Sequence, residues 1–221
     1  MGIYAWSNTA GVWARGALQI YYGVDLTRIR WLSAQSDMEG LTAGMRLEPL
    51  PQHEGATDEV MDDLLLSGTL DAVIGPNVLP GISRRDPRIG RLFPDYKTEE
   101  QGYFRATGIF PISHVVTLSQ DFVSRHPHAP VALLEAYRKG RDVAFDRIEG
   151  SDPAILTISW ASALMAEQRE LMGDRYWAYN IEDNRVALQA MVQFAHEQGL
   201  TPSRLGYTSF FDPAAAELPG W

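Results

Sequence analysis

Cysteine is absent from the 221-residue sequence, which excludes disulfides, thiolate metal sites and cysteine nucleophiles. Basic residues are scarce, because 19 lysines and arginines stand against 28 aspartates and glutamates, for a net charge of −9. This balance argues against a general phosphate-binding surface, and no basic cluster with interleaved aromatics is present, so we expect no nucleic-acid partner. Apolar runs stop well short of the ~18 residues that a membrane span needs, so we expect no membrane insertion.

Motifs for common cofactors are also missing. The sequence contains no Walker loop, GxGxxG, GxSxG or HExxH, and its 5 histidines show no metal-ligand spacing. We therefore predict no metal site and no cofactor. The N-terminus lacks the basic-then-apolar pattern of a secretory signal, which favours a cytoplasmic location, or a periplasmic one if the true N-terminus is missing.

The first half of the chain instead alternates short apolar runs with amphipathic stretches, which predicts an α/β fold. The apolar runs expected to form strands are residues 2–6, 29–32, 45–50 and 70–75. Strands that alternate with helices in this way imply parallel pairing with crossover helices. In such sheets ligands bind beyond the carboxyl ends of the strands, which places the turns at 7–9 and 75–77 on one rim.

The turn Ser7-Asn8-Thr9 precedes a predicted helix that ends at Gly23. All three residues are good helix N-caps, and capping alone explains them. A second interpretation is that the exposed N–H groups of this helix end also bind an anionic ligand. On the same rim, Asn77 is a further candidate for ligand binding.

Arginines could complete such an anion site. Arg84 and Arg85 lie in a loop-rich segment, and Arg105 lies close to the expected central strand. The plain interpretation is a solvated segment with local ion pairs worth about 0–1 kcal/mol each. The alternative is that one of them clamps a carboxylate, for which a guanidinium group is well suited.

Residues 108–118 separate the alternating first half from a second half that reads almost entirely as helices. Ile112 to Leu118 is an apolar, β-branched run, which predicts a buried strand. A histidine inside it, His114, needs a partner, because burying an unpaired imidazole costs about 1–3 kcal/mol. A structural role for His114 and a catalytic one both fit this pattern.

Segments spread over nearly the whole chain carry a family resemblance. They are Thr9 to Gly16, Tyr21 to Asp25, Arg91 to Asp95, Tyr103 to His114, Leu171 to Asp174 with Trp177, Asn184-Arg185, and His196 to Leu200. In these segments the sequence resembles the 4,5-dihydroxyphthalate decarboxylase family, which has the type II periplasmic-binding-protein fold. The resemblance implies one complete α/β lobe at 1–105, the second lobe of that fold. It also implies that 106–221 holds a crossover strand and the C-terminal helices of an incomplete first lobe.

Members of that family normally carry further residues before a segment like Met1-Gly2-Ile3, so the resemblance implies that an N-terminal part is lacking. We expect the chain to be a gene fragment, the product of a mis-called start, or one part of a split protein. Its partners would then be a homo-oligomeric copy or a separately encoded N-terminal portion, besides a small aromatic carboxylate.

The resemblance also implies a reaction, the non-oxidative decarboxylation of a hydroxylated aromatic dicarboxylate. It gives His114 the role of proton donor, while Ser7, Asn8 and Thr9 with Arg84, Arg85 or Arg105 bind the retained carboxylate. The alternatives are a solute-binding protein that captures a small carboxylate for import or sensing, and a remnant without function.

Overall fold

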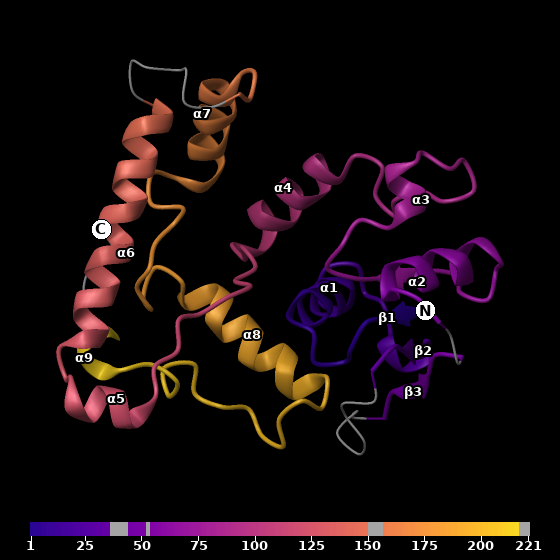
Figure 1. Cartoon of the computed structure of the whole chain (residues 1–221), viewed down its shortest axis with the longest axis horizontal. Helices are drawn as coiled ribbons and strands as arrows, with labels where there is room; N and C mark the ends of the chain where they lie inside the picture. Colours follow the sequence, from indigo (N-terminus) through magenta and orange to yellow (C-terminus); the bar gives the residue numbers. More distant parts are fainter. Residues whose placement is uncertain (36–43, 52–53, 150–156, 217–221) are drawn as a thin grey trace. The chain divides into compact units, whose positions relative to one another are not determined.

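The structure, a computed structural model, describes residues 1–35, 44–51, 54–149 and 157–216 (Figure 1). Its strands are β1 (Gly2–Ile3), β2 (Arg30–Ser33), β3 (Arg46–Pro49) and β4 (Val73–Ile74). Its helices are α1 (Thr9–Ile20), the 3₁₀ turn η1 (Leu26–Arg28), α2 (Thr57–Leu66), α3 (Pro80–Ser83), α4 (Tyr96–Thr107), α5 (Gln120–Arg125), α6 (Ala129–Glu149), α7 (Ala161–Met172), α8 (Arg185–Glu197) and α9 (Pro213–Ala216).

The chain divides into two compact units. Unit 1 comprises residues 1–113 and 190–205, and unit 2 comprises residues 114–189 and 206–221. All four strands belong to unit 1, whereas the described part of unit 2 is helices and connecting segments. The assignment of 1–105 and 106–221 to two lobes stays a prediction.

Unit 1 contains the parallel sheet that the alternating sequence pattern predicts. The strand order is β3-β2-β1-β4, and each neighbouring pair is parallel. Ile3 on β1 is in register with Ser33 on β2 and with Ile74 on β4. From β1 the chain adds β2 and β3 on one side, and after α2 it returns to place β4 on the other side. The strand order therefore reverses between β1 and β4, which is where sheets of this class bind ligands.

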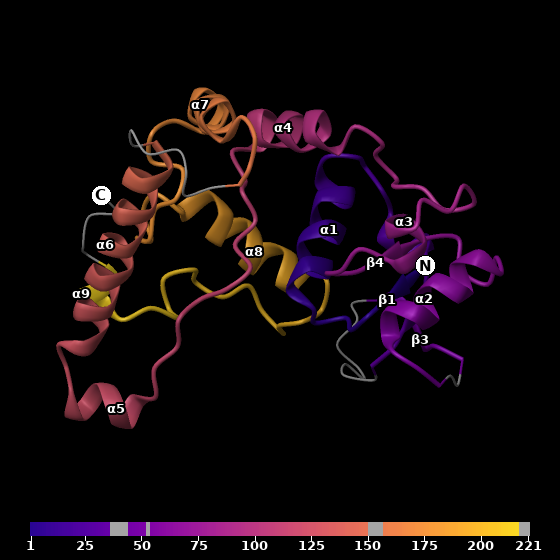
Figure 2. The same cartoon turned by 45° about the horizontal axis from the view of Figure 1, so that its top comes forward.

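Successive residues of β2 point to opposite faces of this sheet and build a core on each. Leu32 packs with Met61 of α2 and with Leu70 on one face. Trp31 packs with Ile3 and Trp6 on the other. Since Arg15 of α1 lies near the Trp31 ring, with its guanidinium carbon 6.0 Å from the ring centroid, α1 covers this second face (Figure 2). The helices that precede β2 and β4 thus lie on opposite sides of the sheet.

A buried polar cluster attaches the C-terminal end of α8 to α1. Arg15, which is fully buried, donates from Nε to Gln198 Oε1 at 2.8 Å and from Nη2 to the Trp6 carbonyl at 2.5 Å. Gln198 in turn donates from Nε2 to the Val12 carbonyl at 3.0 Å. The guanidinium carbon also lies 3.9 Å from the Trp6 ring centroid, within range of a cation–π interaction. These contacts explain why residues 190–205 belong to unit 1.

Unit 2 is organised around the long helix α6. Phe145 of this helix packs against Tyr176, with ring centroids 5.3 Å apart. The buried Arg141 donates from Nη2 to Asp142 Oδ1 at 2.7 Å and from Nη1 to the Trp177 carbonyl at 3.2 Å. A salt bridge of 2.6 Å between Glu149 and an arginine of α7 connects the end of α6 to that helix.

The prediction of a buried strand at 112–118 is wrong. This stretch follows α4 as extended chain that pairs with no strand among the described residues. Val115 and Val116 are 62% and 59% exposed. A β-branched run indicates a preference for extended backbone, but a strand also needs a neighbour to pair its N–H and C=O groups. Near its start, the Ile112 carbonyl accepts from the Trp13 indole N–H at 2.9 Å.

The helices of the second half are close to those predicted from the sequence. Ser119 caps α5 by accepting from the Phe122 N–H at 3.3 Å, and α6 follows from Ala129 to Glu149. The sequence also predicts a helix from 151–153 to Gly173, and its start lies outside the described residues. Residues 157–160 are not helical, so that part of the prediction is wrong, and α7 begins at Ala161 and ends at Gly173, whose φ is +79°.

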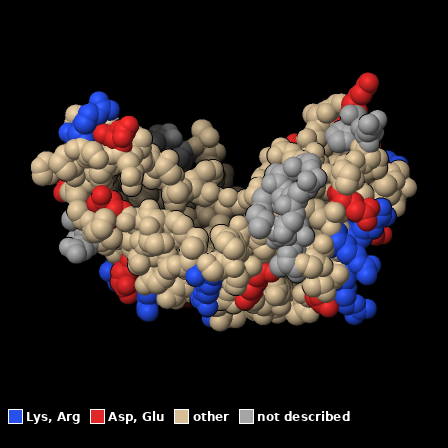
Figure 3. All heavy atoms as spheres, turned by 90° about the horizontal axis from the view of Figure 1, so that it is seen from below, with Lys and Arg blue, Asp and Glu red and all other residues tan. Residues whose placement is uncertain are grey.

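No helix in the described ranges is long and apolar enough to cross a membrane. On the face of the molecule drawn in Figure 3, basic and acidic side chains occur singly or in small mixed groups.

Candidate functional site

The reversal point of the sheet brings together side chains from three separate elements. Tyr4 directly follows β1, Asn77 lies in the turn after β4, and Asp58 lies in the first turn of α2. The Tyr4 hydroxyl donates a short hydrogen bond to Asp58 Oδ1. The Asn77 amide donates to Asp58 Oδ2 at 3.0 Å and to Oδ1 at 3.2 Å. We call these residues, Tyr4, Asp58 and Asn77, the rim cluster.

Gly75 allows the rim cluster to form. An added Cβ at this position would lie 2.2 Å from Cε2 of the Tyr4 ring. Because real side chains do not approach so closely, only glycine lets the backbone after β4 pass beside Tyr4. The close approach holds the Tyr4 ring against the turn that carries Asn77.

Electrostatics keep the Tyr4 hydroxyl protonated. Burial raises the pKa of Tyr4, and its hydrogen bond to the Asp58 carboxylate raises the pKa further. At neutral pH Tyr4 is therefore a hydrogen-bond donor and not a proton acceptor. The negative charge of the cluster resides on Asp58.

The turn at 7–9 follows the same strand as Tyr4. Asn8 is the N-cap of α1, because its Oδ1 accepts from the Gly11 N–H at 3.2 Å and its carbonyl accepts from the Val12 N–H at 2.9 Å. Thr9 is the first residue of the helix, and Ser7 is exposed. The predicted capping role is confirmed for Asn8, while anion binding by this turn stays a prediction.

Of the predicted ligand-binding arginines, Arg84 has a structural partner. Its Nη2 donates to Asp62 Oδ2 at 2.9 Å, while Asp62 Oδ1 accepts from the Gly81 N–H at 2.9 Å. Asp62 is buried, so Arg84 neutralises a carboxylate inside unit 1 and fixes α3 against α2.

The other two arginines are not joined to the rim cluster by any contact among the described residues. Arg85 is exposed and adopts a left-handed backbone with φ +58°. Arg105 lies in the last turn of α4 and donates to Gln101 Oε1 at 3.3 Å. The structure therefore brings Asn77 into a cluster but gathers none of the arginines there.

His114 lies at the start of unit 2 in the extended stretch after α4, and its side chain is exposed. The expectation of a buried imidazole is wrong, because this stretch forms no strand that would cover it. An exposed ring is hydrated and needs no protein partner. Its proposed role as proton donor stays a prediction.

Sequence reasoning missed two members of the rim cluster. Tyr4 falls in the apolar run expected at 2–6, and the sequence pattern does not single out Asp58. Their contact depends on the arrangement of the strands, since Tyr4 follows β1 and Asp58 lies in the first turn of the helix that leads to β4.

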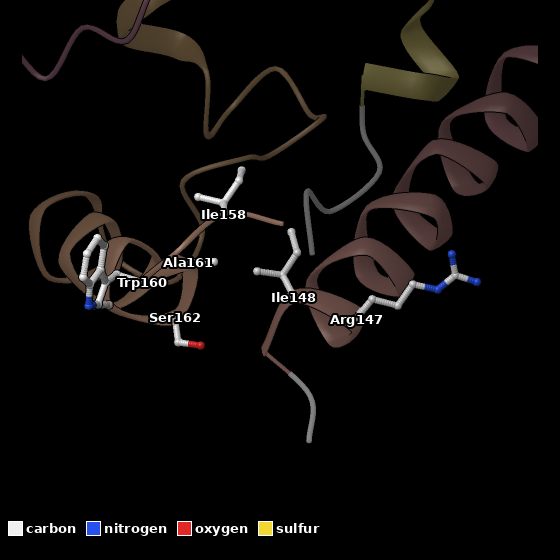
Figure 4. A pocket seen from close by; sticks show the side chains of 7 residues that line it. Arg147, Ile148, Ile158, Trp160, Ala161 and Ser162 are labelled. Carbon is white, nitrogen blue, oxygen red and sulfur yellow. The ribbon is translucent and has the colours of Figure 1, made fainter. Parts of the chain in front are cut away.

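A separate pocket of about 320 Å³ lies in unit 2 between the end of α6 and the start of α7. Ile148 and Ile158 both line it, while Arg147 points away (Figure 4). Its lining offers little to a charged ligand. Within the described ranges, no group of His, Asp and Glu side chains is arranged to hold a metal ion.

Comparison with known proteins connects this chain to one group of enzymes. A 4,5-dihydroxyphthalate decarboxylase of Comamonas testosteroni is 28% identical over 225 aligned residues, 98% of this chain. The chain is similar to proteins named 4,5-dihydroxyphthalate decarboxylase. A protein of the same name from Pseudomonas putida is 26% identical over 114 residues, 48% of this chain. No family model matches the sequence.

The similarity to 4,5-dihydroxyphthalate decarboxylases covers only part of each of those proteins. The alignments span 67% of the Comamonas protein and 42% of the Pseudomonas protein. The resemblance noted in the sequence is thus supported over almost the whole of this chain.

Proposed function

We propose that the protein is a non-oxidative decarboxylase of a hydroxylated aromatic dicarboxylate such as 4,5-dihydroxyphthalate. The observation that carries this proposal is the similarity to proteins of that name along 98% of the chain. The rim cluster supports it, since three polar side chains converge at the sheet position where ligands of parallel α/β folds bind.

The reaction requires a proton and a place for an electron pair. In 4,5-dihydroxyphthalate each carboxylate has a hydroxyl para to it. Electron donation from that oxygen lets the ring carbon that bears the carboxylate accept a proton. The carbon–carbon bond then breaks, its electron pair restores the aromatic ring, and carbon dioxide leaves. The products are carbon dioxide and 3,4-dihydroxybenzoate, and the net reaction consumes one proton.

In this proposal His114 delivers the proton, because an imidazole is the side chain whose ordinary pKa lies near neutrality. The turn at 7–9, with the N–H groups at the start of α1, binds the carboxylate that is retained. The type II periplasmic-binding-protein architecture, with two lobes that close over the ligand, would exclude water from the reacting carbon.

The test is incubation of the purified chain with 4,5-dihydroxyphthalate, followed by measurement of carbon dioxide and 3,4-dihydroxybenzoate. We expect turnover by the wild type, and a loss of about 100-fold or more in His114→Gln with ligand affinity largely kept. Turnover at the wild-type rate in His114→Gln would remove this residue from the mechanism. A matched control is His126→Gln, which changes another described histidine that the proposal does not use.

A solute-binding protein is the alternative outcome of the same experiment. Binding of 4,5-dihydroxyphthalate without release of carbon dioxide would contradict a decarboxylase and favour capture without chemistry. Neither binding nor turnover would favour a remnant without function.

A further inference from the structure

The rim cluster presents a negatively charged acceptor at the ligand-binding edge of the sheet. Asp58 is the only ionised member, because Asn77 is neutral and the Tyr4 hydroxyl is a donor. Asp58 is partly exposed at its position in α2, so a ligand can reach it. Four residues further along the same helix, Asp62 is buried in an ion pair with Arg84. Of these two acids, Asp58 can therefore bind a ligand, whereas Asp62 is already paired inside the protein.

A carboxylate can accept about four hydrogen bonds, two at each oxygen. Within the described residues, Asp58 Oδ1 accepts from both Tyr4 and Asn77, whereas Oδ2 accepts from Asn77 alone. Oδ2 thus keeps acceptor capacity. The donors on either side fix the orientation of the carboxylate, so this capacity has a defined direction. A group that binds there must donate a hydrogen bond.

We propose that Asp58, held in place by Tyr4 and Asn77, accepts hydrogen bonds from the ring hydroxyls of the ligand. This inference rests on the proposed function, since it assigns a recognition residue for a ligand of that class. The charge of Asp58 also orients the ligand. A carboxylate repels the carboxylates of the ligand and attracts the hydroxyls on the opposite edge of its ring. Asp58 therefore selects hydroxylated aromatic acids over their unsubstituted analogues and sets which way round they bind.

The selectivity has a physical basis that an experiment can measure. A site built to accept a ligand hydroxyl discriminates strongly against an analogue that lacks it, because the acceptor then loses water without gaining a partner. One hydrogen bond to a charged acceptor corresponds to about 10- to 100-fold in affinity. Methyl ethers keep the ring oxygens but cannot donate, so they separate hydrogen bonding from ring size and electronics.

The experiment compares the affinities of 4,5-dihydroxyphthalate, 4,5-dimethoxyphthalate and phthalate by calorimetric titration of the full chain. The titrations are brief, and product is assayed afterwards to correct for turnover. For the wild type we expect the dihydroxy compound to bind about 10- to 100-fold more tightly than either analogue. In Asp58→Asn this preference should fall to within a few-fold.

The matched control is Glu59→Gln, which removes one negative charge from the same turn of α2. Glu59 is exposed, and the hydrogen bonds of Tyr4 and Asn77 go to Asp58, so the preference should remain. A loss in Glu59→Gln equal to that in Asp58→Asn would overturn the proposal, because general charge would then be responsible. Retention of the full preference in Asp58→Asn would also overturn it.

The wild-type series decides the question even if Asp58→Asn does not fold. Equal affinity for the three compounds would overturn the proposed role of Asp58. It would not overturn the proposed function, which release of carbon dioxide would still support. Tight, hydroxyl-selective binding without carbon dioxide supports the role of Asp58 and contradicts the decarboxylase. A chain that neither binds nor decarboxylates overturns both.

Discussion

The two acids on one face of α2 show how burial decides the role of a residue. Asp62 is 1% exposed and is satisfied by Arg84 and the Gly81 N–H. Asp58 is less buried and is surrounded by neutral donors. A buried carboxylate needs a paired charge, whereas a carboxylate at the rim is stabilised by water and by donor groups. Asp62 therefore has a structural role, and Asp58 is accessible for ligand binding.

Gly75→Ala tests the packing of the rim cluster without changing any charge. The new methyl group would overlap the Tyr4 ring and displace it, which should break the hydrogen bond to Asp58. We expect a loss of about 1–3 kcal/mol in the free energy of unfolding, measured by urea denaturation, together with weaker ligand binding.

The control for this change is Gly90→Ala, because an added Cβ at Gly90 meets nothing within 4 Å. It should leave both measurements within error of the wild type. An unchanged Gly75→Ala variant would mean that Tyr4 does not pack against this turn.

Alkaline pH should destabilise unit 1 through its tyrosines. Burial and a hydrogen bond to Glu99 at 3.1 Å raise the pKa of Tyr22 to about 12, and burial and Asp58 raise that of Tyr4. An unfolded tyrosine loses its proton near pH 10, so the unfolded state binds fewer protons than the folded state above that pH. These two tyrosines therefore make their full contribution to the free energy of unfolding below pH 10, and this contribution falls as the pH rises toward 12.

Urea denaturation at pH values from 8 to 11 measures this slope. Tyr22→Phe and Tyr4→Phe should each make the decline shallower, because the substituted group no longer titrates. An identical decline in the double variant would show that these hydroxyls titrate normally in the folded protein.

At the level of elements, the alternation of apolar runs and helices was sufficient to predict the parallel sheet. The runs at 2–6 and 70–75 became the shorter strands β1 and β4, because pairing reaches only as far as neighbouring residues are in register. The run at 112–118 did not become a strand, since its residues have no pairing partner among the described ones. Local preference can be read from sequence, but the presence of a partner strand cannot.

The same limit applies to the candidate site. Strand order predicted that the turn with Asn77 would lie at a ligand-binding rim. The contact between Tyr4 and Asp58 joins residues 54 positions apart, and nothing in their local pattern indicates it. The sequence favours a local ion pair for Arg84 and leaves a ligand carboxylate as the alternative, and only the fold shows that Asp62 is its partner.

The junction between α1 and α8 depends on a close helix contact at Gly16. An added Cβ there would lie 2.2 Å from the Phe194 ring, which is almost fully buried. Gly16→Ala should therefore lower the free energy of unfolding by about 1–3 kcal/mol despite the better helix propensity of alanine. Thermal and urea denaturation both report this loss.

Gly140→Ala is the matched control, since Gly140 lies inside α6 and an added Cβ meets nothing within 4 Å. Alanine should stabilise this helix by about 0.5–1 kcal/mol. If Gly16→Ala were also stabilising, α1 and α8 would not be in the close contact described.

At the scale of the whole molecule, unit 1 carries the sheet, the rim cluster and the polar cluster around Arg15, while His114 begins unit 2. We predict that variants of the rim cluster change ligand affinity and that His114→Gln changes turnover.

Decarboxylation in deuterium oxide tests the central claim most directly. The proposed reaction replaces one carboxylate with a hydrogen taken from an acidic group that exchanges with solvent. We therefore expect 3,4-dihydroxybenzoate that carries one deuterium, at the ring carbon that lost carbon dioxide, as measured by mass spectrometry and proton NMR. Recovery of unchanged 4,5-dihydroxyphthalate after prolonged incubation with the folded chain would contradict the account.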